Sequence, residues 1–317
     1  MKNLFYSIVT AAFIYLFAAC DPIVDNVAVN NVVSSADQIQ ATVTPLVVNG
    51  KNSNKVQVHC TSPVLCQWTD GILTYVSNDT VMTLFSTGNV NITLNALASD
   101  GKSYSKEYSV DIDEMTFAVD PHWELFAGEG TSGKTWVYAF DIPSGWTPGV
   151  NAGGVYGNGG YLENNAPTWW SNGLSDLQGW GTANDQMTFD LNGGANFTLV
   201  TGNTQKQDDG SAKGLQAGTY KGSFKFDFSK AVAMGSSSGV GATGDNNWSI
   251  GTLSLSGGNP IPTISLGYLP NNGNAPIYTY NILYLDDNVM ILGAPEPGAG
   301  DWGTAWFWVF KRQGYTF

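Results

Sequence analysis

The chain has 317 residues, a formal net charge of −13 and only 12% charged residues, whereas aromatic residues make up 13% of it. An acidic chain repels nucleic acid and anionic lipid surfaces, so neither is expected as a partner. A composition rich in aromatic residues, Gly and Asn suits neutral ligands that carry many hydroxyl groups. The length favours two domains, because single cores rarely keep growing beyond about 250 residues.

Residues 1–19 have the pattern of a secretory signal peptide. Lys2 gives a basic start, and the apolar run that follows is too short to span a bilayer comfortably. Small residues then precede Cys20, an ending that resembles the lipobox of bacterial lipoproteins, with Phe17 where that family usually has Leu. The resemblance implies cleavage before Cys20, lipidation of Cys20, a tether over residues 20–28 and a lipid-anchored, surface-exposed place on the outer membrane. An uncleaved membrane anchor is the alternative.

Residues 29–114 alternate between short β-type runs and turn signals such as Asn49-Gly50 and Asp100-Gly101. Several short strands in a segment of this size predict an immunoglobulin-like β-sandwich. The expected strands are residues 39–48, 56–59, 81–85, 90–97 and 104–112.

The same segment contains SPVLCQWTDG (62–71), followed by FSTGNVNITLNALASDGKSYSKEYSVDID (85–113). A Trp before an Asp-Gly turn, then an aromatic residue, a Gly and a V-x-x-L strand, resembles PKD domains, although their fuller F-G-D-G turn is reduced here. The resemblance implies a PKD-like domain that acts as a spacer. The matching residues are Trp68, Asp70, Gly71, Phe85, Gly88, Val90 and Leu94.

Two cysteines remain once Cys20 is assigned to the lipid. Cys60 and Cys66 flank a Pro-containing loop, and in an exported chain they either form a disulfide or remain two free thiols. His59 beside them suggests a metal site, but the chain has only one other histidine, so a four-ligand zinc site is not expected. No cofactor is expected, and Asp286 and Asp287 are the candidate ligands for a structural calcium ion.

The composition changes after residues 115–122, since ten of the eleven Trp lie between Trp123 and Trp308. Residues 118–317 show alternating runs without a sustained helical period, which predicts an all-β domain, a sandwich or jelly roll. Long connections over 142–180 and 202–218 suggest function or disorder. The expected strands are residues 134–140, 187–191, 197–201, 222–228, 248–255, 277–285, 289–292 and 304–311.

Residues 128–135, GEGTSGKT, match the letters of a phosphate-binding loop, G-x-x-x-x-G-K-[ST]. Such a loop needs a strand before it and a helix after it, because the helix N-terminus helps to hold the phosphates. The following TWVYAFDIPSGW is aromatic and β-branched and predicts a strand that begins near Lys134. We therefore expect no nucleotide partner and interpret the stretch as a glycine-rich hairpin turn.

This stretch lies within a longer segment, WELFAGEGTSGKTWVYAFD, which is followed by APTWW (166–170) and NDQMTFDLNGG (184–194). This skeleton resembles a recurrent pattern in Bacteroidota surface lipoproteins, which often pair it with a PKD-like domain and tend to be encoded among glycan-utilisation systems. The resemblance implies a glycan-related role at the cell surface, with outer-membrane uptake machinery as a partner, but it implies no reaction. The residues that carry it are Trp123, Gly133, Lys134, Thr135, Trp136, Pro167, Trp169, Trp170 and Phe189.

The richest functional stretch is GGVYGNGGYLENNAPTWW (153–170). Sugars present apolar C–H faces that stack on aromatic rings, and their hydroxyl groups need amide and carboxylate partners. Glycines would let the backbone approach a ligand closely. The alternative is that these aromatic residues fill the domain's own core and that the glycines serve turns. The candidate carbohydrate-binding residues are Trp146, Tyr156, Tyr161, Glu163, Asn164, Trp169, Trp170 and Trp180.

No catalytic residue is predicted. Glycoside hydrolysis needs two carboxylates on either side of the scissile bond. The nearest phrase to the E-x-D-x-x-E strand of laminarinase-like hydrolases, VDIDEM (110–115), lacks the first Glu and closes the first domain. A G-x-S-x-G nucleophile motif is absent from the sequence. The expected function is non-catalytic capture of a neutral glycan; a glycoside hydrolase and a purely structural or adhesion protein are the alternatives.

Overall fold

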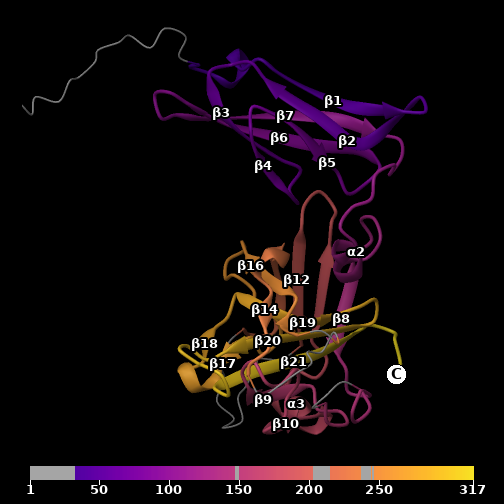
Figure 1. Ribbon diagram of the computed structural model, residues 1–317, viewed down its shortest axis with the longest axis vertical. Helices are drawn as coiled ribbons and strands as arrows, with labels where there is room; N and C mark the ends of the chain where they lie inside the picture. The colour runs from indigo at the N-terminus through magenta and orange to yellow at the C-terminus, as the bar shows by residue number, and fades with distance from the viewer. Residues whose placement is uncertain (1–32, 147–149, 203–214, 237–243, 245) are drawn as a thin grey trace, which may run out of the picture.

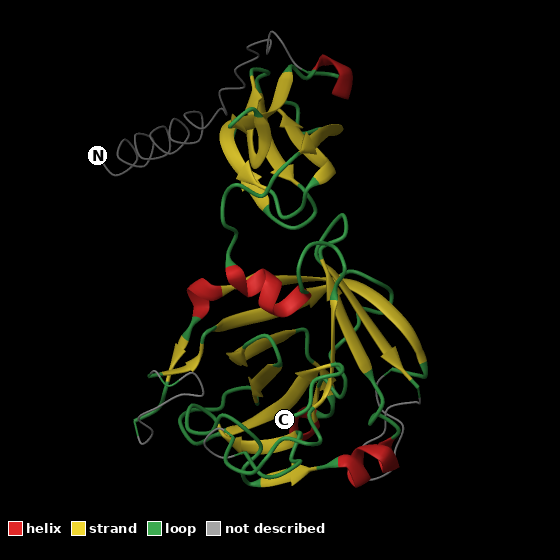
Figure 2. Cartoon of the chain, turned by 90° about the vertical axis from the view of Figure 1, so that its right-hand side faces the viewer, coloured by secondary structure: helices red, strands yellow, loops and turns green. Residues whose placement is uncertain are grey.

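The computed structural model describes residues 33–146, 150–202, 215–236, 244 and 246–317. The predicted signal peptide, Cys20 and the tether over 20–28 lie outside the described residues. The described chain forms two β-rich bodies, and the two α-helices within it, α2 (Pro121–Ala127) and α3 (Leu174–Trp180), have seven residues each (Figures 1 and 2). The all-β prediction is confirmed. In this part of the chain no helix has the length and apolar character needed to cross a membrane.

The N-terminal body is a sandwich of two antiparallel sheets with strand orders β1-β2-β5 and β4-β3-β6-β7. Buried and exposed residues alternate along β2 and β3, so each sheet turns one face toward a shared core. Trp68 is fully buried in that core. The elements are η1 (Ala36–Gln38), β1 (Ala41–Val48), β2 (Lys51–Cys60), β3 (Val64–Thr69), β4 (Thr74–Val76), β5 (Asp79–Thr83), β6 (Gly88–Ala98) and β7 (Ser103–Ile112).

The C-terminal body is built on one sheet that closes on itself, because the last strand, β21, pairs with the first, β8. The prediction of a two-sheet sandwich or jelly roll for this domain is therefore corrected to a closed, barrel-like sheet. Each of the eight expected runs of the second segment overlaps one of its strands. In ring order they are β8 (Lys134–Tyr138), β11 (Gln186–Asp190), β12 (Asn196–Thr201), β13 (Gly218–Asp227), β16 (Gly251–Ser256), β19 (Thr279–Leu285), β20 (Val289–Pro295) and β21 (Thr304–Arg312).

The closed sheet has a two-stranded arm. The N-terminal half of β21 pairs with β9 (Tyr156–Gly160), which pairs with β10 (Trp170–Asn172), while the C-terminal half of β21 pairs with β8. Figure 1 shows β9, β10 and α3 at the end of the domain that lies away from the sandwich. The remaining short elements are β14 (Val232–Ala233), β15 (Asn247–Ser249), β17 (Tyr268–Leu269), β18 (Ala275–Pro276), η2 (Phe228–Lys230) and η3 (Pro270–Asn272).

Helix α2 covers one end of the closed sheet. Asp120 caps it by accepting a hydrogen bond from the N–H of His122, and Pro121 stands at its first position, where proline is well tolerated. The ring of Phe126 lies 4.3 Å from that of Phe189 and 4.6 Å from that of Phe226. The helix therefore inserts its apolar side into the aromatic interior of the ring.

The interior is filled further along by the buried segment 263–269. The hydroxyl of Tyr138 donates to the carbonyl of Ser265 at 3.1 Å, and Nε1 of Trp308 donates to the carbonyl of Leu266 at 3.2 Å. Both donors are almost fully buried, so these bonds satisfy polar groups that would otherwise be costly to bury. The closed sheet thus encloses packed side chains and this segment.

GEGTSGKT connects α2 to β8. The predicted strand after it begins at Lys134, as expected, but the helix lies before the loop, and the loop is not a hairpin turn. Gly133 has φ of 81°, and a Cβ there would lie 3.0 Å from Cβ of Asp190, so this position requires glycine. Nζ of Lys134 donates to the carbonyl oxygens of Leu125 at 2.6 Å and Asp287 at 3.3 Å. The lysine therefore ties the end of α2 to the β19–β20 turn.

The two bodies contact each other at the linker, at a turn of the sandwich, and through Phe85, whose ring lies 5.2 Å from that of Trp123. Residues 113–120 connect β7 to α2, and the N–H of Phe117 donates to Oδ1 of Asn54 at 2.9 Å. Away from this linker, the N–H of Ala195 donates to the carbonyl of Gly71 at 3.1 Å. A Cβ on Gly71 would lie 2.8 Å from the carbonyl oxygen of Gly193. The Asp-Gly turn of the sandwich is therefore pressed against the β11–β12 hairpin of the closed sheet.

Candidate functional site

The arm of the closed sheet lines up large aromatic residues on one face. In the register of β10, β9 and β21, Trp170 is opposite Asn158, and Asn158 is opposite Trp306. Directly opposed residues of antiparallel strands point to the same side of a sheet. Tyr156, two residues before Asn158 on β9, points to that side as well. The two tryptophans therefore flank Asn158 from neighbouring strands.

The rings on this side contact one another. Trp170 lies 5.9 Å from Trp306 in an edge-on arrangement, and Tyr156 stacks on Trp306 at 5.6 Å. Trp180, the last residue of α3, lies 6.2 Å from Trp170 and 5.9 Å from Tyr156. These separations are typical of favourable aromatic pairs. A layer of interlocked rings thus covers the arm.

Trp302 adds a fifth ring to this side. It precedes β21, and its N–H donates to the carbonyl of Tyr161 at 3.1 Å. Its ring is packed so closely on β9 that a Cβ on Gly160 would lie 2.8 Å from its Cε3 atom. Because Gly160 has the same parity along β9 as Asn158, this contact lies on the aromatic side. We call Tyr156, Trp170, Trp180, Trp302 and Trp306 together the tryptophan face.

Exposure divides the tryptophan face into two layers. Tyr156 and Trp306 are buried, whereas Trp170 is 38% exposed and Trp302 is 49% exposed. Large aromatic residues that remain this exposed leave apolar area in water, which a ligand could cover. The buried rings hold Trp170 in place and β9 supports Trp302, so the surface they present is pre-formed.

Polar groups accompany the rings. Nε1 of Trp306 donates to Oε1 of Glu296 at 2.7 Å, and the same oxygen accepts the N–H of Asn271 at 3.3 Å. Oδ1 of Asn158 is buried and finds no hydrogen-bond partner in the described part of the chain. Glu296 therefore orients the ring of Trp306, and Asn158 lies between Trp306 and Trp170.

Glu163 belongs to a pair of carboxyl groups beside Trp302. Its hydrogen bond to Asp301 is the main cause that holds the pKa of Asp301 below its usual value. Asp301 also accepts hydrogen bonds from the N–H and hydroxyl groups of Ser236, and a Cβ on Gly235 would overlap both carboxyl groups. Glycosidases need their two carboxyl groups about 5–9 Å apart. Two carboxyl groups in direct contact do not have that geometry.

Trp169 is 51% exposed and lies just before β10, where its N–H donates to the carbonyl of Asn158 at 3.0 Å. Its ring contacts no other aromatic ring among the described residues. It adjoins the tryptophan face without joining the interlocked rings.

Three candidate residues lie elsewhere. Trp146 packs edge-on against Tyr284 at 4.9 Å, on the strand β19. Tyr161 packs edge-on against Trp248 at 4.8 Å, and Nε1 of Trp248 donates to the carbonyl of Asn164 at 2.7 Å. Trp248 covers the side of β21 opposite the tryptophan face. The structure therefore gives Trp146, Tyr161 and Asn164 packing and hydrogen-bonding roles in the domain itself.

The glycines of β9 make room for the protein's own atoms. A Cβ on Gly159 would lie 3.2 Å from the ring of Phe307, and one on Gly157 would overlap the carbonyl of Trp170. Together with the contact of Gly160 and Trp302, this accounts for the run YGNGG. We expected these glycines to let a ligand approach the backbone. In the structure they instead let neighbouring strands and rings pack closely.

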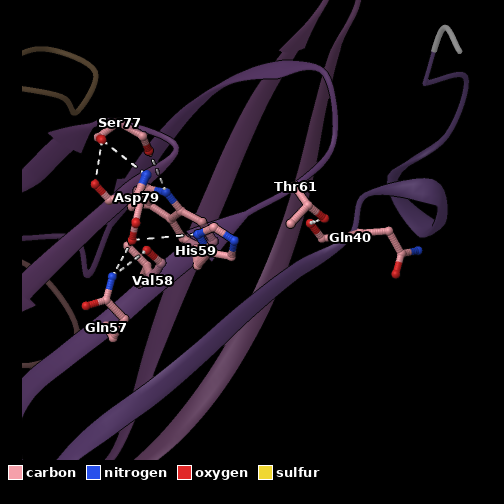
Figure 3. Close-up of polar contacts among 8 residues, drawn as sticks. Gln40, Gln57, Val58, His59, Thr61, Ser77 and Asp79 are labelled. Carbon is pink, nitrogen blue, oxygen red and sulfur yellow. Dashed lines mark hydrogen bonds and ion pairs between the residues drawn. The ribbon is translucent and has the colours of Figure 1, made fainter.

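The described residues contain no group of three or more His, Cys, Asp or Glu side chains placed to hold a metal ion. The carboxylate of Asp286 accepts hydrogen bonds from the hydroxyl of Tyr284 and two backbone N–H groups of the β19–β20 turn, at 2.7–2.8 Å. Figure 3 shows the ring of His59 directed toward Asp79, with Nδ1 3.7 Å from its carboxylate. Since Cys60 alternates with His59 along β2 and is buried, histidine and thiol point to opposite sides.

The sequence matches no protein-family model and no curated protein.

Proposed function

We propose that this protein binds neutral oligosaccharide or polysaccharide on the tryptophan face without catalysing a reaction. The observation that carries the proposal is the exposure of Trp170 against the buried ring of Trp306, which stacks on Tyr156, together with the exposed Trp302 packed on Gly160 of the same arm. A sugar ring stacks its C–H face on an indole ring, and a rigid aromatic platform loses little conformational entropy on binding.

The charge of the chain supports a neutral ligand. The net charge of −13 disfavours anionic polymers, and only 12% of residues are charged. The carboxyl groups of Glu296 and Asp301 are the nearby groups available to pair with sugar hydroxyls. Such groups would choose among sugars, while the rings supply most of the contact area.

We further propose that the N-terminal sandwich is a PKD-like, immunoglobulin-like spacer and that the chain is anchored to the outer membrane through lipid on Cys20. The buried Trp68, followed by the Asp-Gly turn that meets the second domain, supports the PKD-like assignment. The tryptophan face lies at the end of the molecule away from the sandwich (Figure 1). That position would present it to glycan outside the cell and hand the glycan to uptake machinery.

The geometry favours neither alternative function. The contact between the carboxyl groups of Glu163 and Asp301 lacks the separation that glycoside hydrolysis needs. A purely structural role would be favoured by burial of every tryptophan, whereas Trp169, Trp170 and Trp302 are exposed.

The test is affinity electrophoresis of the protein in gels that contain a panel of neutral polysaccharides. Trp170→Ala and Trp302→Ala should each weaken binding by about 1–2 kcal/mol, a roughly 5- to 30-fold rise in Kd. Trp169→Ala is the control for Trp170→Ala, because this neighbouring ring is also exposed but contacts no other aromatic ring among the described residues. Absence of retention on the whole panel, or an equal loss in all three variants, would refute the assignment of the site.

A further inference from the structure

Cys60 and Cys66 face each other inside the N-terminal sandwich. Cys60 ends β2, in the three-stranded sheet, and Cys66 lies on β3, in the four-stranded sheet. Both are free thiols, and they are 4% and 2% exposed. Burial, with the hydrogen bond from the Cys60 thiol as the next cause, raises the pKa of Cys66 to about 12. Two reduced thiols are therefore in contact across the core between the sheets.

The surroundings of the pair are apolar. Trp68, two residues after Cys66, is fully buried, and the ring of Tyr108 lies 5.9 Å from it. The hydroxyl of Tyr108 is buried without a partner among the described residues. Burial and the two nearby thiols raise the pKa of Tyr108. The causes that act on the Cys66 thiol are burial and the Cys60 thiol, and both disfavour a thiolate, so these surroundings do not activate the pair for nucleophilic chemistry.

We infer that Cys60 and Cys66 are a disulfide-forming pair that links the two sheets of the sandwich when the chain folds in the presence of a disulfide oxidant. Both thiols lie in the one core between the two sheets, and the short loop between them keeps them together in the unfolded chain. The inference uses only the N-terminal domain and stands independently of the proposed glycan site.

The chemistry needs an oxidant of the disulfide class, such as glutathione disulfide or a thiol–disulfide oxidoreductase. One cysteine loses its proton, and its thiolate attacks the oxidant, forming a mixed disulfide and releasing one thiol. The second cysteine loses its proton and attacks the mixed disulfide, which forms the intramolecular S–S bond and releases the second thiol. The protein loses two electrons and two protons, and the oxidant is reduced to two thiols.

The order of events follows from burial. A thiolate must form and reach the oxidant, but in the folded domain both thiols are enclosed and that of Cys66 resists deprotonation. Oxidation should therefore occur while the chain folds and before the sheets close. Reduced protein that has already folded should be oxidised at least tenfold more slowly than protein that refolds with the oxidant.

The experiment uses the full chain with Cys20→Ser, which removes the third thiol. The protein is reduced, unfolded in urea, refolded with reduced glutathione and glutathione disulfide, then unfolded again and alkylated for mass spectrometry. The expected product is about 2 Da lighter than the reduced chain and carries no alkyl group. Two alkyl groups, or glutathione adducts as in the single variants Cys60→Ser and Cys66→Ser, would overturn the inference.

A second measurement, thermal unfolding, tests whether the disulfide stabilises the folded chain. The oxidised chain should unfold on the order of 10 °C higher than the same chain with reductant. The double variant Cys60→Ala/Cys66→Ala should show no such dependence on reductant. A reductant-dependent shift of equal size in the double variant would show that the effect does not come from this pair.

Discussion

The sharpest test of the tryptophan face leaves every aromatic residue in place. Gly160 lies on β9 beneath Trp302, and a Cβ at this position would lie 2.8 Å from Cε3 of that ring. No real Cβ contact is that short, so in Gly160→Ala either the ring or the strand must move. The ring is 49% exposed and can move outward more easily than the strand, which is paired with β21 at Gly160.

The expected changes in stability and binding follow if the ring moves and the strand does not. Moving the ring of Trp302 keeps the barrel core intact, so the free energy of unfolding should change by less than about 1 kcal/mol. The displaced ring no longer occupies its place on the arm, and a ligand that stacks on it should lose about 1 kcal/mol of binding, roughly a fivefold rise in Kd. A variant with near-normal stability and weakened binding is the expected outcome.

The assay pairs urea unfolding with affinity electrophoresis on whichever polysaccharide retains the parent protein. Gly179→Ala is the control: Gly179 lies within α3, and a Cβ there would have nothing within 4 Å. This control should bind normally and gain up to about 1 kcal/mol of stability, as alanine does in a helix. Unchanged binding in Gly160→Ala, with Trp302→Ala impaired, would show that the position of this ring does not matter and would refute the reasoning.

Three further predictions concern stability. Phe126→Ala should lower the free energy of unfolding by about 3–5 kcal/mol, seen as a lower urea midpoint, because this ring is fully buried inside the closed sheet. Lys134→Met should cost about 1–3 kcal/mol in the same assay, since the carbonyl of Leu125 loses a charged donor at 2.6 Å. Burial raises the pKa of Asp70 against the opposing effect of backbone N–H groups. A carboxyl whose pKa is higher in the folded state loses stability as pH rises from about 4 through that pKa. The Tm of Asp70→Asn minus the Tm of the parent should therefore be larger at pH 7 than at pH 4. A smaller difference at pH 7 would contradict the assigned cause.

Alternation along the chain was enough to locate the strands of the closed sheet but not its closure. Runs such as 187–191 and 304–311 alternate because each strand has one face in the core. The pairing of β21 with β8 joins residues near the two ends of the domain, and nothing in either strand alone specifies it. A sandwich was therefore as consistent with the pattern as a ring.

The sequence did not predict helix α2, because the residue types in this segment are more typical of strands. Trp123 and Phe126 favour strands, and seven residues are too few for a helical period to emerge. The signals present in the sequence are Asp120 and Pro121, which are typical of a helix start. Contact with the aromatic interior outweighs the local preference.

The candidate site was predicted in part for a similar reason. Tyr156, Trp170 and Trp180 were named from one local stretch and do meet on one face. Trp302 and Trp306 arrive from the other end of the domain through the β9–β21 pairing, which no local pattern shows. Tyr161 turned to the opposite side because the side of a sheet on which a residue lies depends on the register of its neighbours.

Strand β8 has the fewest backbone pairings with its neighbours of the eight strands in the ring. It shares three residue pairs with β11 and three with β21, whereas β20 and β21 share seven. Its anchorage comes instead from its side chains: Nε1 of Trp136 donates to the carbonyl of Phe126 at 2.9 Å, and Tyr138 is bonded to Ser265. Local opening of the domain should therefore begin by peeling away this strand, with its amide hydrogens exchanging before those of β20. Strand β8, which directly follows the glycine-rich loop, therefore closes an otherwise open seven-stranded sheet into a ring.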